Sequence, residues 1–225
     1  DMGFMFCLCG DLKNLNVSNF NTSKVTNMQN MFSSLGVENL DLRNFDTRNV
    51  TDMYFMFADN FNLKNIDVSS FNTSNVENFY AMFYQCTSLK VLNVSNFDVS
   101  PSSSWYFYVD ELFSKCTSLQ CLYVSPSMSG LSSSACNGIG TEEHPCYIVA
   151  PAGFDFGVDT SLSYFTWKNG IFKLSTAEEV ATDIMIIDNQ EKKPRKWYDL
   201  NGRRLYDDPK TKGVYIKEGQ KVVVH

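Results

Sequence analysis

A phrase of about 25 residues repeats through the first half of this chain and constrains its fold more than any other feature. Residues 20–28, 45–53 and 71–79 share a pattern of Phe, Asn or Asp, Thr and Val, and each is soon followed by Met-Phe. The leading Phe recurs after 25 residues (20 to 45) and then after 26 (45 to 71). A fixed period of this length is typical of stacked units and not of a globular enzyme core. We therefore expect a solenoid whose function resides on its surface.

Each unit divides into two parts with different apolar spacing. The first part has the form Leu-x-x-Leu-x-Val, as in Leu63, Ile66 and Val68, and its alternation favours a short strand with one buried face. The second part, as in residues 50–57, places Val, Met and Phe at helical spacing. Thr47 stands just before it, where a hydroxyl can cap a helix. The pattern predicts a parallel sheet on one face of the solenoid and short helices on the other.

The longest copy of the phrase, from Leu63 to Leu89, resembles the leucine-rich repeats of BspA-like bacterial surface proteins. The resemblance covers about residues 1–125, with about four to five units, and implies an α/β leucine-rich repeat solenoid that begins inside a repeat. The common leucine-rich repeat has Asn or Cys at its ninth position. Here Phe occupies that position, so we do not expect the Asn ladder of that class.

Two further segments follow the repeats. Residues 126–180 contain a Ser/Gly-rich loop and an aromatic stretch, and we expect them to cap the open end of the solenoid. Residues 181–225 predict a small all-β module with strands over 183–187, 196–200, 213–217 and 220–224, joined by turns at 201–202 and 218–219. Its residues 198–204 and 212–216 resemble the C-terminal module of exported Bacteroidetes proteins and the sorting domains of type IX secretion, which implies export.

The net charge differs between the main body of the chain and its C-terminal segment, and it restricts the kinds of partner that we expect. Residues 1–188 carry 9 Lys and Arg against 20 Asp and Glu, a net charge of −11, whereas residues 189–225 carry 10 against 5, a net charge of +5. Such asymmetry indicates separate modules, and an acidic body argues against nucleic acid as a partner. No apolar run reaches the roughly 20 residues of a transmembrane helix. We expect any export signal to lie upstream of residue 1.

The chain contains no recognisable catalytic motif. Gly-x-Ser-x-Gly, phosphate-binding Gly loops and His-Glu-x-x-His are absent, and two His residues do not suggest a zinc site. We therefore expect no enzyme, no metal and no cofactor. Cys136 and Cys146 flank a Gly-rich loop and are the better disulfide candidates, while Cys136 with His144 is a weaker candidate for a nucleophile and its base. Cys86 and Cys116 suit small buried positions in neighbouring units, and a disulfide between them is the alternative.

The predicted sheet leaves one polar position per unit pointing outward. Asn16 lies between the inward Leu15 and Val17, and later units place Asp, Asn or Tyr at the same position. In the fourth unit, an insertion at residues 101–104 precedes an aromatic stretch. Its Trp105 and Tyr108 align with Asn75 and Asn78 and are expected to point outward as well. The candidate partner-binding residues are Asn16, Asp41, Asp67, Asn93, Tyr123, Trp105 and Tyr108. The alternatives are a polar face that only keeps the sheet soluble, and aromatics that pack under the cap.

These features favour an exported bacterial repeat protein, extracellular or associated with the outer membrane. Its expected function is adhesion to, or recognition of, a host or bacterial surface protein or glycan through the solenoid surface. The alternative is a structural spacer that displays another domain and has no ligand of its own.

Overall fold

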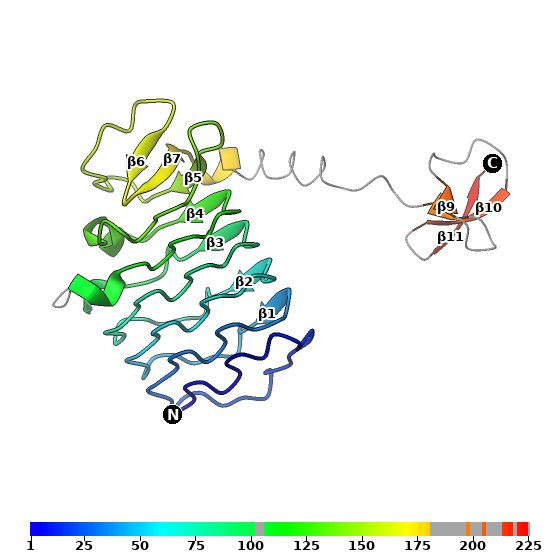
Figure 1. Ribbon diagram of the computed structural model, residues 1–225, viewed down its shortest axis with the longest axis horizontal. Coiled ribbons are helices and arrows are strands. Elements are labelled where there is room, and N and C mark those ends of the chain that lie inside the picture. Colours follow the sequence, from blue (N-terminus) through cyan, green and yellow to red (C-terminus); the bar gives the residue numbers. More distant parts are fainter. Residues whose placement is uncertain (102–105, 181–196, 199–203, 206–212, 218–219, 225) are drawn as a thin grey trace. The chain divides into compact units, whose positions relative to one another are not determined.

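A computed structural model describes residues 1–101, 106–180, 197–198, 204–205, 213–217 and 220–224. The chain divides into two compact units, Asp1–Ala177 and Glu178–His225. The first unit is a solenoid in which successive coils of the chain stack on one another (Figure 1). Hydrogen bonds between neighbouring coils show which residues are equivalent, and we take one such residue as the start of each coil. The amide that follows this residue donates to the carbonyl of the equivalent residue in the next coil. The starting residues number the coils from one to five as Asp1, Asn27, Asp52, Asn78 and Tyr108.

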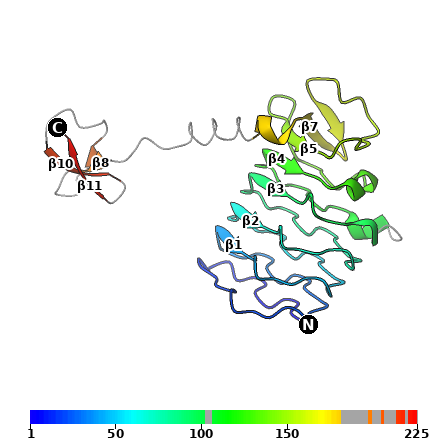
Figure 2. The ribbon, with the colours of Figure 1, turned by 180° about the vertical axis from the view of Figure 1, so that it is seen from behind.

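Short parallel strands line one side of the solenoid, as the sequence predicts (Figures 1 and 2). β1 (Asn39–Asp41) pairs with β2 (Asn65–Asp67), and β3 (Val91–Asn93) pairs with β4 (Cys121–Tyr123), each in parallel. The strands have three residues each and recur at the same place in coils 2 to 5. The equivalent residues of coil 1, around Leu15 to Val17, form no strand, so the strand expected there is absent.

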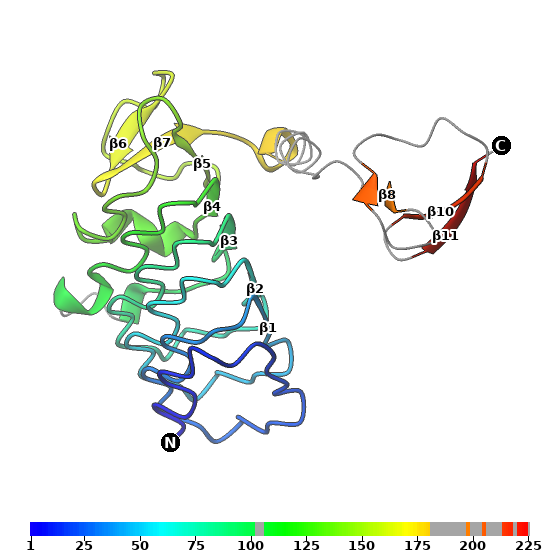
Figure 3. The same cartoon turned by 45° about the vertical axis from the view of Figure 1, so that its right-hand side comes forward.

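The segment after the repeats extends the sheet. β5 (Cys146–Val149) pairs in parallel with β4, and β7 (Gly170–Leu174) pairs in parallel with β5. β6 (Phe165–Trp167) closes the sheet antiparallel to β7. The 3-10 helices η2 (Tyr106–Val109) and η3 (Pro126–Gly130) lie on the side opposite the strands (Figure 3), and residues 177–180 are helical.

Apolar side chains from every coil fill the interior. Val50, Met53, Met56 and Phe57 are all fully buried, which confirms that the second part of the repeat points inward. One Phe per coil forms a continuous column through the core, with neighbouring ring centroids 5.3–6.1 Å apart: Phe6, Phe32, Phe57, Phe83 and Phe113. Because each ring packs on the ring of the next coil, the coils stabilise one another.

The prediction of short helices in the repeats is wrong. Residues 28–35 and their equivalents form successive turns, with left-handed backbone at two positions four residues apart, such as Asn30 and Ser34. Alternate amides bond to the next coil and not within the segment: Asn30 N–H donates to Tyr54 O (2.8 Å) and Phe32 N–H to Met56 O (3.0 Å). An α-helix would take these donors into its own segment. We call this the turn side of the solenoid.

The repeated Thr residues do not cap helices either. Thr47 is buried, and its hydroxyl donates to Asn72 O (2.8 Å) while it accepts from Asn72 N–H (2.8 Å). Thr22 and Thr73 bridge to the following coil in the same way. Each buried Thr hydroxyl therefore satisfies one backbone donor and one backbone acceptor of the next coil.

One glycine marks a close approach between coils. A Cβ at Gly36 would lie 2.0 Å from Gly10 O and 2.8 Å from Leu12 O, so no side chain fits there without moving backbone. The contact lies where coil 2 leaves the turn side and heads toward β1.

The second unit contains a four-stranded antiparallel sheet in the order β11-β10-β8-β9. Its strands are β8 (Trp197–Tyr198), β9 (Arg204–Leu205), β10 (Gly213–Lys217) and β11 (Gln220–Val224). The strands expected over 213–217 and 220–224 are confirmed, and Lys217 pairs with Gln220 as in a two-residue hairpin. The strand expected over 183–187 and the turns at 201–202 and 218–219 lie outside the described residues.

Candidate functional site

The structure places the sequence-predicted ladder along the sheet side, one residue per coil. Asn16, Asp41, Asp67 and Asn93 are exposed, and Tyr123 is partly buried. Asp41 pairs in register with Asp67, and Asn93 pairs with Tyr123. The ladder therefore exists as a row of outward side chains.

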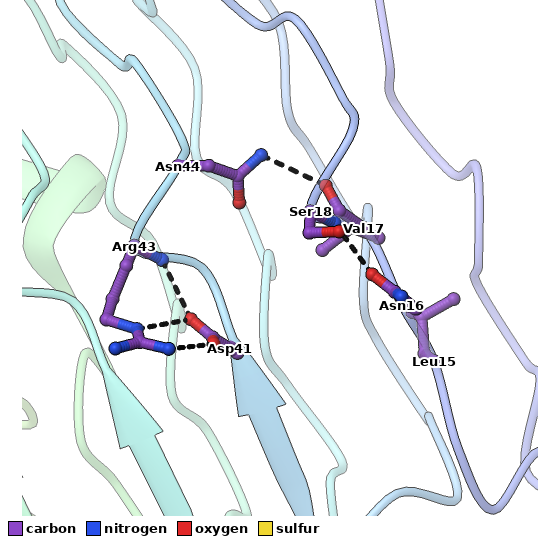
Figure 4. A pocket seen from close by; sticks show the side chains of 7 residues that line it. All are labelled: Leu15, Asn16, Val17, Ser18, Asp41, Arg43 and Asn44. Carbon is purple, nitrogen blue, oxygen red and sulfur yellow. Dashed lines mark hydrogen bonds and ion pairs between the residues drawn. The ribbon is translucent and has the colours of Figure 1, made fainter.

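The start of this row borders an open pocket of ≈ 590 Å³ between coils 1 and 2 (Figure 4). Asn16 and Asp41 line it together with Arg43 and Asn44, and the backbone of residues 15–18 closes one side. Its polar side chains Asn16, Asp41, Arg43 and Asn44 already bond to one another or to backbone.

Each ladder residue has a local structural task. The side-chain oxygen of Asn16 accepts the amide of Ser18 (2.9 Å), and Asp41, Asp67 and Asn93 do the same for the residue two positions on (3.2, 3.0 and 3.1 Å). Such Asx turns bend the chain where each strand ends. The same bond recurs at two further positions per coil, as at Asp46 and Asp52 of the second and third coils. The Asn/Asp repeat therefore has a folding explanation.

Arg43 occupies most of the remaining bonding capacity of Asp41. Its guanidinium donates through Nε to Oδ1 (2.9 Å) and through Nη2 to Oδ2 (2.6 Å). The hydrogen bonds from Arg43 lower the pKa of the Asp41 carboxyl to about 2. Both side chains are exposed, so this pair contributes little to stability. Asn44 is also engaged, because its amide donates to Val17 O (3.0 Å) in the preceding coil.

Of the two aromatic candidates, the structure places Tyr108, which does not join this ladder. Trp105 lies outside the described residues. Tyr108 lies in η2, and its carbonyl accepts from Phe79 N–H (2.7 Å), so it aligns with Asn78 as expected. That position starts the turn side and not the sheet side.

None of the seven cysteines forms a disulfide, including the possible pair of Cys86 and Cys116. Cys136 and Cys146 are both buried free thiols, so the predicted disulfide between them is not formed. Burial raises the pKa of both thiols, whereas a nucleophile needs the thiolate, and His144 is exposed. Cys86 and Cys116 are buried as expected, and each thiol donates to a carbonyl of the preceding coil (3.1 Å).

A cluster of partly exposed aromatic side chains lies on the turn side, and the sequence analysis missed it. Tyr54 and Phe55 come from coil 3, and Tyr80 and Tyr84 from coil 4. The Tyr54 and Tyr80 rings are 5.5 Å apart at 14°, and Phe55 lies 5.6 Å from Tyr80. We call these four residues the aromatic cluster.

Carboxylates and one ammonium group surround the cluster. Asp110 and Glu111 of coil 5 lie near Tyr80. The pKa of the Tyr80 phenol is raised, mainly because the group is partly buried and secondly because of the negative charge of Glu111. Burial also raises the pKa of the Asp59 carboxyl, against the opposing effect of Lys115. Lys115 Nζ lies 4.8 Å from the Tyr84 ring centroid and donates to its hydroxyl.

The signal for this cluster was present in the repeat alignment. The backbone bonds between coils align Gln29, Tyr54, Tyr80 and Asp110 in one column, and Asn30, Phe55, Ala81 and Glu111 in the next. The residue type in these columns changes from coil to coil, whereas the inward and Asx positions repeat. A search for recurring residues therefore overlooks the positions that vary.

Comparison with known proteins places the repeats in a family without an assigned role. A family model described as "Mycoplasma protein of unknown function, DUF285" matches residues 1–121, more than half of the chain. The chain belongs to this family. No curated protein and no solved structure matches it.

The DUF285 region contains the ladder up to Asn93 and the whole aromatic cluster with its flanking charges. In the part of the chain that the structure describes, no group of three or more His, Cys, Asp or Glu residues is arranged to hold a metal ion. The helices described there are all too short or too polar to cross a membrane.

Proposed function

We propose that this protein is an exported bacterial surface protein that recognises a protein or glycan partner through the outer surface of its solenoid. The aromatic cluster carries the proposal. Its four rings are partly exposed on a scaffold whose coils are already joined by backbone bonds, Thr bridges and a buried Phe column. Aromatic rings gathered on a protein surface are typical of interaction sites.

The fold does not require aromatic residues at these positions. Coil 2 has Gln29 and Asn30 where coil 3 has Tyr54 and Phe55, and the backbone angle is the same, with φ 52° at both Asn30 and Phe55. Left-handed backbone is uncommon for a bulky residue and well suited to Asn. Phe55 therefore occupies a position where the backbone disfavours it, which is typical of functional sites.

Two sequence resemblances support export and surface display. The repeat phrase resembles that of BspA-like leucine-rich repeat surface proteins, and the C-terminal module resembles type IX sorting domains. Together they favour an extracellular or outer-membrane-associated location. The ladder of Asn16, Asp41, Asp67 and Asn93 remains a second candidate surface for the same function.

A binding screen with matched variants tests the proposal. The full chain is screened against extracellular-matrix proteins and a glycan array. One variant replaces Tyr54 and Tyr80 by Gln and Phe55 by Asn, the residues that coil 2 has in the same columns. A second variant replaces Asp41 and Asp67 by Asn, which occurs at that position in coils 1 and 4.

We expect saturable binding that the first variant loses while its melting temperature does not fall. Loss only in the second variant would move the site to the sheet side. Absence of binding by a folded protein to every target would contradict the proposal and favour a structural spacer.

A further inference from the structure

The surroundings of the aromatic cluster restrict the chemistry of its partner. Asp110 and Glu111 occupy in coil 5 the two columns that hold Tyr80 and Phe55 in the neighbouring coils. Asp59 follows Phe55 by four residues in coil 3, and Lys115 lies over the Tyr84 ring. Three carboxylates and electron-rich ring faces together attract positive charge. A partner that carries anions would face repulsion at the same place.

The protein already shows how the cluster holds a cation. The Lys115 ammonium lies over the Tyr84 ring and donates to the Tyr84 hydroxyl, while Glu111 and Asp59 lie close enough to favour its charged form. Tyr54, Phe55 and Tyr80 form the other part of the cluster, where their rings contact one another and Phe55 also contacts Tyr84. Tyr54, Phe55 and Tyr80 therefore offer ring faces for a second cation next to the ring that holds the Lys115 ammonium.

The dimensions suit a short extended segment. The cluster and its carboxylates extend over coils 3, 4 and 5. Neighbouring coils are separated by roughly 4.8 Å, as strands in a sheet are, so the surface is about 10 Å long. An extended chain rises about 3.3 Å per residue, so about three residues span the cluster. Long side chains of Lys or Arg reach ring faces and carboxylates from such a segment.

We propose that the aromatic cluster, with Asp59, Asp110 and Glu111, binds a segment of a partner protein that is rich in Lys and Arg. This inference rests on the proposed recognition function and names the partner class for it. The rings supply cation–π contacts, and the carboxylates supply charge-assisted hydrogen bonds.

Coil 2 supplies variants that remove each contribution without a new packing problem. The ring variant is Tyr54→Gln with Tyr80→Gln, as at Gln29. The charge variant is Asp59→Ser with Glu111→Asn, as at Ser34 and Asn30, where the backbone is also left-handed. Asp11→Asn with Glu143→Gln removes two exposed carboxylates elsewhere and is the matched charge control.

The experiment measures fluorescence anisotropy of a labelled Lys-Gly peptide and of its Glu-Gly counterpart, titrated with the full chain. We expect the Lys-Gly peptide to bind, the Glu-Gly peptide not to bind, and added salt to weaken the binding. The ring variant and the charge variant should each lose affinity about tenfold. The control should lose less than about twofold, and melting temperatures should stay unchanged.

Equal binding of both peptides, or unchanged affinity in the ring variant, would overturn the proposal. The screen described above separates the two levels of failure. If the Lys-Gly peptide does not bind but a glycan or another protein does, and the ring variant loses it, the basic partner is wrong while recognition stands. If nothing binds, both proposals fall.

Discussion

The sheet side and the turn side of the solenoid use their outward residues in opposite ways. On the sheet side, the outward Asn and Asp residues repeat from coil to coil because each one closes an Asx turn. On the turn side, Asx turns recur only where it starts, as at Asp52 and Asn78. The outward side chains that follow close no such turn, and they vary from Gln29 to Tyr54 to Asp110. In this solenoid, repetition marks what the fold needs, and variation marks where a binding surface can develop.

The largest effect is expected from a charged residue in the core beneath the turn side. Met56→Asp places an unpaired carboxylate at a fully buried position, and we expect it to cost more than about 4 kcal/mol and to unfold the repeats. Circular dichroism melting measures the effect. Met56→Leu, which conserves volume, should cost less than about 1.5 kcal/mol. A tolerated Met56→Asp beside a disruptive Leu40→Asp in β1 would mean that only the sheet side holds the core.

The close approach between coils 1 and 2 gives the next largest effect. Gly36→Ala would bring a Cβ to 2.0 Å from the Gly10 carbonyl oxygen, so backbone must shift. We expect a loss of about 2–3 kcal/mol in urea unfolding. Gly130→Ala is the control, because nothing lies within 4 Å of its Cβ. Equal stability of the two variants would show that the coils separate easily at this point.

Removing the hydrogen bonds of a buried Thr between two coils tests how much such a bridge contributes to stability. Thr47→Val leaves the amide and carbonyl of Asn72 without their buried partner, and we expect a loss of about 2 kcal/mol. Thr47→Ser keeps the hydroxyl and should retain most of the stability. Chemical denaturation of both variants gives the difference. A Val variant as stable as the Ser variant would show that the bridge adds nothing to coil stacking.

The Asp41–Arg43 pair should give the smallest effect. The folded-state pKa of Asp41, about 2, lies below the ordinary Asp value near 3.9, so its stabilisation is present above about pH 4 and is lost as the pH falls toward 2. Asp41→Asn keeps the Asx turn and removes the ion pair. The melting temperature of the variant should be slightly lower than that of the parent at neutral pH, and the difference should shrink near pH 2 and vanish below it. A difference that is the same at both pH values would rule out the ion pair as its cause.

The sequence determined the inward and outward sets of residues, because both follow from its period. The buried Val50, Met53 and Phe57 and the exposed Asp41 and Asp67 lie where the pattern predicted. The short parallel strands of coils 2 to 5 also followed from the repeat, whereas the strand expected in coil 1 is absent. The sequence further indicated a C-terminal β module, of which the hairpin of β10 and β11 is described.

Tertiary structure alone decided how the backbone of the turn side is bonded. Apolar residues three and four apart suit a helix, but they suit equally a row of turns with two left-handed residues per coil. The choice depends on whether alternate amides find carbonyls in their own segment or in the next coil, and the stacking of neighbouring coils settles it. The same stacking converts Thr47 from an expected cap into a bridge, and brings Tyr54 and Tyr80, 26 residues apart, within 5.5 Å. A local pattern contains no information on either contact, because both form between residues of different coils.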